Sequence, residues 1–228
     1  DQALATISQA MILADTDDTI LVSNGVYGVG AQIVVDKAVT LLSVGGAAQT
    51  TVQRTSGSSR IFHINHAEAV LDGFAVTQGE APLDDLRGAG ILLSDGTVRN
   101  CVITGNVSER ATRGAGIYMV DGVLTNSVIS GNQTKSNRGA GVYMAGGVMA
   151  GCKIIENGSA SYRATYGAGV CLESGSLAVD CLIAGNLGTA STFHRGGGVY
   201  VDGGTLLRSR VVSNAVAGIS SSGGGIFM

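Results

Sequence analysis

The 228-residue sequence contains one proline, no tryptophan, 4% aromatic residues and 14% charged residues. Because 45% of the residues are apolar, this composition indicates a folded chain and excludes a disordered one. The formal net charge of −3, with 14 Lys and Arg in total, disfavours a nucleic-acid-binding protein, which carries a concentrated basic footprint. No stretch approaches the roughly 20 apolar residues that span a bilayer, so we expect no transmembrane segment.

Glycine is the residue in excess, with 36 residues against a usual share of about 7%. Many of these glycines recur in one short pattern, Gly-x-Gly followed by Ile or Val. The pattern begins at Gly88, Gly114, Gly139, Gly167, Gly196 and Gly223. The intervals are 26, 25, 28, 29 and 27 residues, and self-similarity at such a period is typical of repeat architectures.

Within each repeat, apolar residues alternate over short runs, as at Ile117 and Met119, and glycine or asparagine interrupts the runs. Period-two alternation predicts β-strands, and no repeat contains a long helical stretch. A unit of this length with two or three short strands is one rung of a parallel β-helix, whose equivalent residues stack at about 4.8 Å. The sequence therefore predicts an all-β solenoid.

Equivalent positions of the repeats predict interior ladders and a recurrent turn. The first ladder comprises Ile91, Ile117, Val142, Val170 and Val199. The second comprises Ile103, Ile129, Ile154, Ile183 and Val211. Each complete repeat closes on an asparagine, namely Asn106, Asn132, Asn157, Asn186 or Asn214. We expect these amides to turn inward and bond to the same residue one rung above and below.

We expect one β-helix domain over residues 1–228. Residues 1–18 predict an N-terminal capping α-helix, residues 19–87 irregular first rungs, and residues 88–228 regular repeats truncated in the last rung. The apolar face of the helix, over residues 3–14, holds Leu4, Ile7, Met11 and Ala14. Because the chain stops within an uncapped rung, we expect the natural protein to continue past Met228, or its rungs to stack at this C-terminal edge.

These repeats, with Gly-Ala/Gly-Gly-Ile/Val and Ile/Val-x-x-Asn, resemble those of polymorphic outer-membrane proteins and related bacterial surface adhesins. Those proteins belong to the pectin-lyase-like, right-handed parallel β-helix superfamily. The opening is also similar to its N-terminal rungs, from Ala5-Thr6-Ile7 to Leu71-Asp72-Gly73-Phe74. The resemblance implies a right-handed coil and an extracellular or cell-surface location in a bacterium. Since the superfamily includes lyases, glycoside hydrolases, adhesins and spacers, it selects no activity.

Polysaccharide lyases and hydrolases of this superfamily generally place carboxylates, with Arg or Lys, on one exposed sheet. The best-paired acids here are Asp95 and Asp121, one rung apart and near the separation of a retaining glycosidase pair. Each precedes a mid-repeat glycine, however, and we favour the turn role that Asp-Gly also has. The next rungs have Ala145 and Ser174 there, so the sequence predicts no continuing acidic groove.

Histidines and cysteines are the remaining reactive side chains. His63 and His66 lie close to Glu68 and Asp72, but we favour a hydrogen-bonded turn for His66 and a solvated His63 over a metal or acid–base site. The cysteines are Cys101, Cys152, Cys171 and Cys181. Three of them share one ladder position, where we expect buried thiols. Neither group has metal-ligand spacing, so we expect no metal and no cofactor.

Two rows of side chains form the candidate ligand-binding surface. Arg87, Arg113, Arg138 and Arg195 each precede a Gly-x-Gly, with Tyr166 in the remaining place. The aromatic row, expected to face outward, is Tyr118, Tyr143, Tyr200 and Phe227. Residues 88–228 carry 10 basic against 7 acidic side chains, whereas residues 1–87 carry 4 against 10. An aromatic row of this kind can stack on sugar rings, and an arginine row can pair with uronate or sulfate groups. The alternative is that the aromatic side chains only stabilise the sheet face through contacts between strands.

The variable loops are expected to emerge on one side of the solenoid. They are residues 107–113, 133–138, 158–166 and 187–195. The two longest hold Tyr162, Tyr166, Phe193 and His194, and loop-rich sides of solenoids commonly carry binding. We therefore predict a non-catalytic surface or secreted module, an adhesin or stalk that binds glycan or a surface protein. The alternative is a lyase or hydrolase of acidic polysaccharide that uses Asp95, Asp121 and Arg113 or Arg138.

Overall fold

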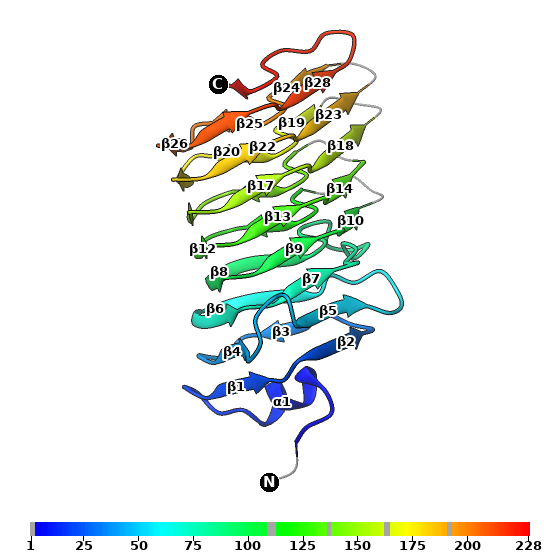
Figure 1. The fold of residues 1–228 in the computed structure, drawn as a ribbon, viewed down its shortest axis with the longest axis vertical. Helices are drawn as coiled ribbons and strands as arrows, with labels where there is room; N and C mark the ends of the chain where they lie inside the picture. Colours follow the sequence, from blue (N-terminus) through cyan, green and yellow to red (C-terminus); the bar gives the residue numbers. More distant parts are fainter. Residues whose placement is uncertain (1–2, 109–112, 136–137, 162–164, 191–192) are drawn as a thin grey trace.

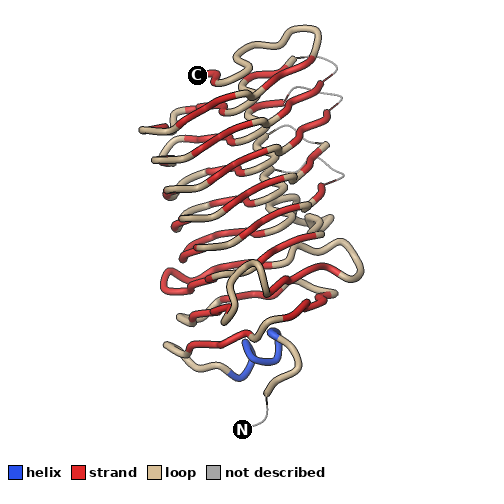
Figure 2. The backbone as a smooth tube through the Cα atoms, in the orientation of Figure 1, coloured by secondary structure: helices blue, strands red, loops and turns tan. Residues whose placement is uncertain are grey.

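The computed structural model describes residues 3–108, 113–135, 138–161, 165–190 and 193–228. The described chain winds into a parallel β-solenoid with one short helix, α1 (Ile7–Leu13), at its N-terminal end (Figures 1 and 2). The predicted all-β solenoid with an N-terminal capping helix is confirmed.

The longest sheet, called the long sheet below, has 14 strands. In its irregular N-terminal part these are β1 (Thr19–Val22), β3 (Ile33–Val35), β4 (Thr40–Ser43), β6 (Phe62–Asp72) and β8 (Ile91–Arg99). In the repeats they are β11 (Ile117–Met119), β12 (Val123–Thr125), β15 (Val142–Met144), β16 (Val148–Ala150), β20 (Val170–Glu173), β21 (Leu177–Val179), β25 (Val199–Asp202), β26 (Thr205–Leu207) and β29 (Ile226–Phe227).

Two further sheets complete the regular rungs, and a two-stranded ladder lies beside them. The second sheet has β2 (Gly25–Val29), β5 (Thr50–Arg54), β7 (Ala75–Thr77), β9 (Val102–Thr104), β13 (Val128–Ser130), β17 (Lys153–Ile155), β22 (Leu182–Ala184) and β27 (Arg210–Val212). The third sheet has β10 (Val107–Ser108), β14 (Gln133–Thr134), β18 (Gly158–Ser161), β23 (Leu187–Ala190) and β28 (Ala215–Ala217). The two-stranded ladder pairs β19 (Thr165–Tyr166) with β24 (His194–Arg195).

The rung that starts with β11 shows how a repeat folds. β11 and β12 both belong to the long sheet, and a turn at Gly122, with φ of 84°, separates them. β13 follows in the second sheet, and β14 follows in the third sheet after the turn at Asn132. Successive rungs repeat this path, so that Ile117 pairs with Val142 in parallel register.

The predicted ladders form the core. All five members of the first ladder and the first four of the second are 0% exposed, and Val211 of the last complete rung is partly buried against them. Similar side chains on successive rungs therefore contact each other along the axis, which is the main source of burial in a solenoid.

The Gly-x-Gly segments are required by the close approach of neighbouring rungs. Gly114 has a φ of 65°, and a Cβ there would lie 2.0 Å from the carbonyl oxygen of Ile117. A Cβ at Gly116 would lie 2.5 Å from the carbonyl oxygen of Gly141 on the next rung. A larger residue at Gly114 would therefore collide with its own rung, and one at Gly116 would push neighbouring rungs apart.

Buried asparagine amides bond along the axis at the turn between the second and third sheets. Asn132 Nδ2 donates to Asn157 Oδ1 at 3.0 Å, and the same oxygen accepts the Asn132 backbone N–H at 3.1 Å. The same pair of bonds joins Asn106 to Asn132, Asn157 to Asn186 and Asn186 to Asn214. These bonds satisfy buried backbone donors that the turn would otherwise leave unpaired.

The N-terminal part differs from the expectation in two respects. Thr6 caps α1 by accepting the Gln9 N–H at 3.2 Å, so Leu4 precedes the helix and is 49% exposed, whereas Ile7 and Met11 are buried. Within the irregular first rungs, strands β2 and β5 form where the sequence gives no strand signal, because glycine and polar residues break their apolar alternation. No helix in the described chain is long and apolar enough to cross a membrane.

Candidate functional site

The arginine row lies immediately before the long-sheet strands of the repeats. Isolated parallel β-bridges join the backbones of neighbouring members of the row. They pair Arg87 with Arg113, Arg113 with Arg138, and Arg138 with Tyr166. Arg195 continues the row one rung further on, where it pairs with Tyr166 across the two-stranded ladder. The row therefore places guanidinium groups at three successive rungs and at a fourth beyond Tyr166, beside the outer face of the long sheet.

The first half of the aromatic row is covered. Tyr118 and Tyr143 are 7% and 0% exposed, and their rings stack with centroids 4.8 Å apart. The guanidinium of Arg87 lies 5.7 Å from the Tyr118 ring, and that of Arg113 lies 5.3 Å from the Tyr143 ring. A sugar ring has no access to these tyrosines, which corrects their assignment as ligand-binding residues. They stabilise the sheet face instead.

The accessible aromatic residues gather over the last rungs. We call this cluster the aromatic–arginine patch, and it comprises Arg138, Tyr166, Phe193, Arg195, Tyr200 and Phe227. The Arg195 guanidinium lies 5.0 Å from the Phe227 ring and 5.7 Å from the Phe193 ring, which is 38% exposed. The Tyr200 ring lies 4.9 Å from that of Tyr166 and 5.9 Å from that of Phe227. The patch thus presents ring faces and cations together.

Two carboxylates lie beside the patch. Glu173 on β20 is the parallel partner of Asp202 on β25, one rung away. Arg138 Nη1 lies 2.8 Å from Glu173 Oε1 and 3.7 Å from Asp202 Oδ2. Burial, followed by the hydrogen bond to Glu173, raises the pKa of the Tyr143 phenol. An acidic pair with a bridging arginine therefore exists, at positions that the sequence did not single out.

The acids that the sequence did single out serve as turn acceptors. Asp95 Oδ1 accepts the Gly96 N–H at 2.7 Å, and Asp121 Oδ1 accepts the Gly122 N–H at 2.8 Å. Both bonds stabilise the mid-repeat turn, which agrees with the Asp-Gly interpretation favoured above.

His63 is held within the outer face of the long sheet. Its Nε2 lies 2.9 Å from Ser94 Oγ, and burial together with nearby Arg60 lowers its pKa. It is half-buried and hydrogen-bonded, not solvated as expected. His66 Nδ1 accepts the Glu68 N–H at 3.2 Å within β6.

All four cysteines are buried free thiols. Cys152 and Cys181 donate to the carbonyl oxygens of Ala150 and Val179 at 3.4 and 3.3 Å. In the part of the chain that the structure describes, no group of three or more His, Cys, Asp or Glu could hold a metal ion.

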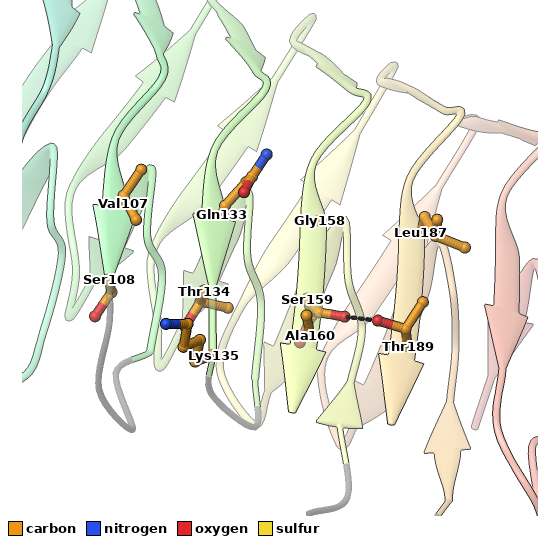
Figure 3. A pocket seen from close by; sticks show the side chains of 10 residues that line it. All are labelled: Val107, Ser108, Gln133, Thr134, Lys135, Gly158, Ser159, Ala160, Leu187 and Thr189. Carbon is orange, nitrogen blue, oxygen red and sulfur yellow. Dashed lines mark hydrogen bonds between the residues drawn. The ribbon is translucent and has the colours of Figure 1, made fainter. Parts of the chain in front are cut away.

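A groove of about 240 Å³ runs across β10, β14, β18 and β23 of the third sheet (Figure 3). We call it the loop-side groove, and its lining includes Val107, Gln133, Lys135, Gly158, Ala160, Leu187 and Thr189. The predicted variable loops thus begin as strands and end in the arginine row or the two-stranded ladder. Their middle residues, including Tyr162, lie outside the described residues.

Residues 82–227 match the family model described as a right-handed β-helix region. The match covers more than half of the chain. This chain belongs to the right-handed β-helix family. A search of curated proteins and a search of solved structures both returned no match to the β-helix described here.

Several site residues of this β-helix escaped the sequence analysis. Glu173 and Asp202 leave no periodic signal, because the corresponding residues of the two preceding repeats, Val120 and Ala145, are apolar. Phe193 and His194 stood out in a loop, but the structure separates their environments, with Phe193 in the patch and His194 only 2% exposed. His194 Nε2 lies 2.9 Å from Thr165 Oγ1 and so joins β24 to β19.

Proposed function

We propose that this β-helix is a non-catalytic binding module of a bacterial cell-surface or secreted protein, an adhesin or stalk that binds an acidic glycan. The aromatic–arginine patch carries the proposal. Its rings offer apolar faces to the C–H face of a pyranose, and Arg195 and Arg138 offer donors to a carboxylate or sulfate. The resemblance of the repeats to those of bacterial surface proteins supports the location.

The charge of the repeats also supports an anionic ligand. Residues 88–228 have a net charge of +3, against −6 for residues 1–87. Arg195, which is exposed, can pair with the negative charges of a polyuronate or sulfated chain, whereas Arg87 and Arg138 already pair with Asp85 and Glu173. Asp95 and Asp121 support a non-catalytic role because both carboxylates are engaged in turns.

The test is binding to a glycan array that includes pectate, alginate and heparin oligosaccharides, followed by calorimetric titration of hexagalacturonate. Phe193→Ala and Arg195→Ala should each weaken binding about tenfold, equivalent to about 1.4 kcal/mol. Arg208→Ala is the matched control, because Arg208 is an exposed arginine paired with Asp180 outside the patch. Unchanged affinity of both patch variants would refute the assignment.

A second function, cleavage of an acidic polysaccharide, is favoured by one observation, the Glu173–Asp202 pair with Arg138 between the carboxylates. Such an activity would release reducing ends or unsaturated products from pectate or alginate. It would also be lost in Glu173→Gln. Products that form with the wild type and not with this variant would replace the binding-only proposal.

A further inference from the structure

We propose that the loop-side groove is a second glycan site, in which a notch at Gly158 seats one pyranose ring. This inference rests on the glycan-binding function proposed above and adds a position for one sugar on a different sheet. The groove lies on the third sheet, whereas the aromatic–arginine patch lies beside the long sheet.

The notch arises because one rung lacks a side chain. Gln133, Gly158 and Leu187 are register partners on β14, β18 and β23, so they form a column along the axis. Figure 3 shows the side chains of Gln133 and Leu187 on either side of Gly158. Rungs are about 4.8 Å apart, so the two side chains stand roughly 10 Å apart across the gap. A flat ring in this gap can contact both walls.

The fold itself does not require glycine at this position. Gly158 lies in a strand without a positive φ, and a Cβ there would meet no atom closer than Gln133 Cγ, at 3.8 Å. By contrast, a Cβ at Gly141 would lie 2.6 Å from the carbonyl oxygen of Gly169. A side chain at 158 would also favour the strand, since glycine weakens strand interiors. Glycine at position 158 therefore keeps the groove open, although the backbone conformation does not require a glycine there.

The walls of the notch have the chemistry to recognise a sugar ring and its hydroxyl groups. Leu187 is 46% exposed and offers an apolar surface to the C–H face of a ring. Gln133 carries both donors and an acceptor for hydroxyl groups. The Thr189 hydroxyl donates its hydrogen to the Ser159 carbonyl oxygen at 3.3 Å. The lone pairs of the Thr189 oxygen can then accept a hydrogen bond from a sugar hydroxyl.

The experiment fills the notch and measures the affinity for hexagalacturonate by calorimetry. Gly158→Val should weaken binding at the notch about tenfold and leave binding at the aromatic–arginine patch unchanged, with a melting temperature that is unchanged or higher. Gly158→Ala, which adds only the tolerated Cβ, should give a smaller loss in a fully folded protein. Ala184→Val makes a comparable change on β22 of the second sheet, outside the groove, and should leave the affinity unchanged.

Three outcomes separate this inference from the function on which it rests. If Gly158→Val binds like the wild type while Phe193→Ala loses affinity, the notch is refuted and the patch stands. If the wild type binds no hexagalacturonate, alginate or heparin oligosaccharide, both the notch and the proposed function are refuted. If cellohexaose, a neutral chain, binds as tightly as hexagalacturonate and loses affinity equally in Gly158→Val, the anionic class is wrong.

Discussion

Replacement of Asn157 by alanine tests whether the asparagine ladder holds the rungs together. The Asn157 side chain is 1% exposed, and its Oδ1 accepts two hydrogen bonds from Asn132, one from the backbone N–H and one from Nδ2. Its own Nδ2 donates to Asn186 Oδ1 and to the Ile129 carbonyl oxygen. Asn157→Ala would therefore leave two Asn132 donors without this acceptor, in a turn from which water is excluded.

A buried polar group left unsatisfied costs about 1–3 kcal/mol, so two such donors predict a loss of about 2–6 kcal/mol in the free energy of unfolding. Urea unfolding followed by circular dichroism measures this loss. Asn214→Ala is the matched control, because Asn214 accepts the same two bonds at a partly exposed position where water replaces them. The reasoning is refuted if the loss at Asn157 is below about 1 kcal/mol or no larger than that at Asn214.

Three further predictions concern packing and ionisation. Gly141→Ala should destabilise the protein by about 1–3 kcal/mol, because its Cβ would lie 2.6 Å from the Gly169 carbonyl oxygen; a melting temperature equal to that of the wild type would contradict this. Burial raises the pKa of Cys101 and Cys171 to about 12. At about pH 8 a disulfide reagent should therefore leave both thiols unmodified in the native protein and react with all four thiols in urea. Rapid reaction of the native protein would show that Cys101 and Cys171 are accessible. Burial lowers the pKa of His194 in the folded protein below the ordinary 6.5, so on acidification the imidazole is protonated first in the unfolded chain. The contribution of His194 to folding stability is therefore complete above about pH 6.5 and is lost as the pH falls through the folded-state pKa. His194→Gln should flatten the pH dependence of unfolding below that value, and an unchanged pH profile would assign the dependence to other groups.

Much of the fold was predictable because its determinants are local and repeated. Gly116 recurs at each rung since the next rung leaves no room for a Cβ, and Asn132 recurs since each turn has a buried donor to satisfy. Residues under such steric and hydrogen-bonding constraints leave a periodic signal in the sequence. Strands β2 and β5 lie before the regular repeats, where glycine and polar residues interrupt the alternation, and no such signal marked them.

The candidate site was predicted only in part, because a side chain on the outer face of the sheet is not necessarily exposed to solvent. Tyr143 has the outward register that the alternation predicts, yet Arg113 from the preceding rung covers its ring. Tyr200 has the same register and stays partly exposed beside Phe193 and Phe227. The row residue of the preceding rung differs between the two, because Arg113 lies over Tyr143 whereas Tyr166 lies beside Tyr200.

The most direct test of the central claim, that the aromatic–arginine patch binds an acidic glycan, is an NMR titration of phenylalanine-labelled protein with hexagalacturonate. The chain has four phenylalanines, of which Phe193 and Phe227 belong to the patch and Phe62 and Phe74 are 0% exposed in the core. We predict that the ring resonances of Phe193 and Phe227 shift in a saturable manner while those of Phe62 and Phe74 stay fixed. Saturable binding that leaves the Phe193 and Phe227 resonances unmoved would contradict the account.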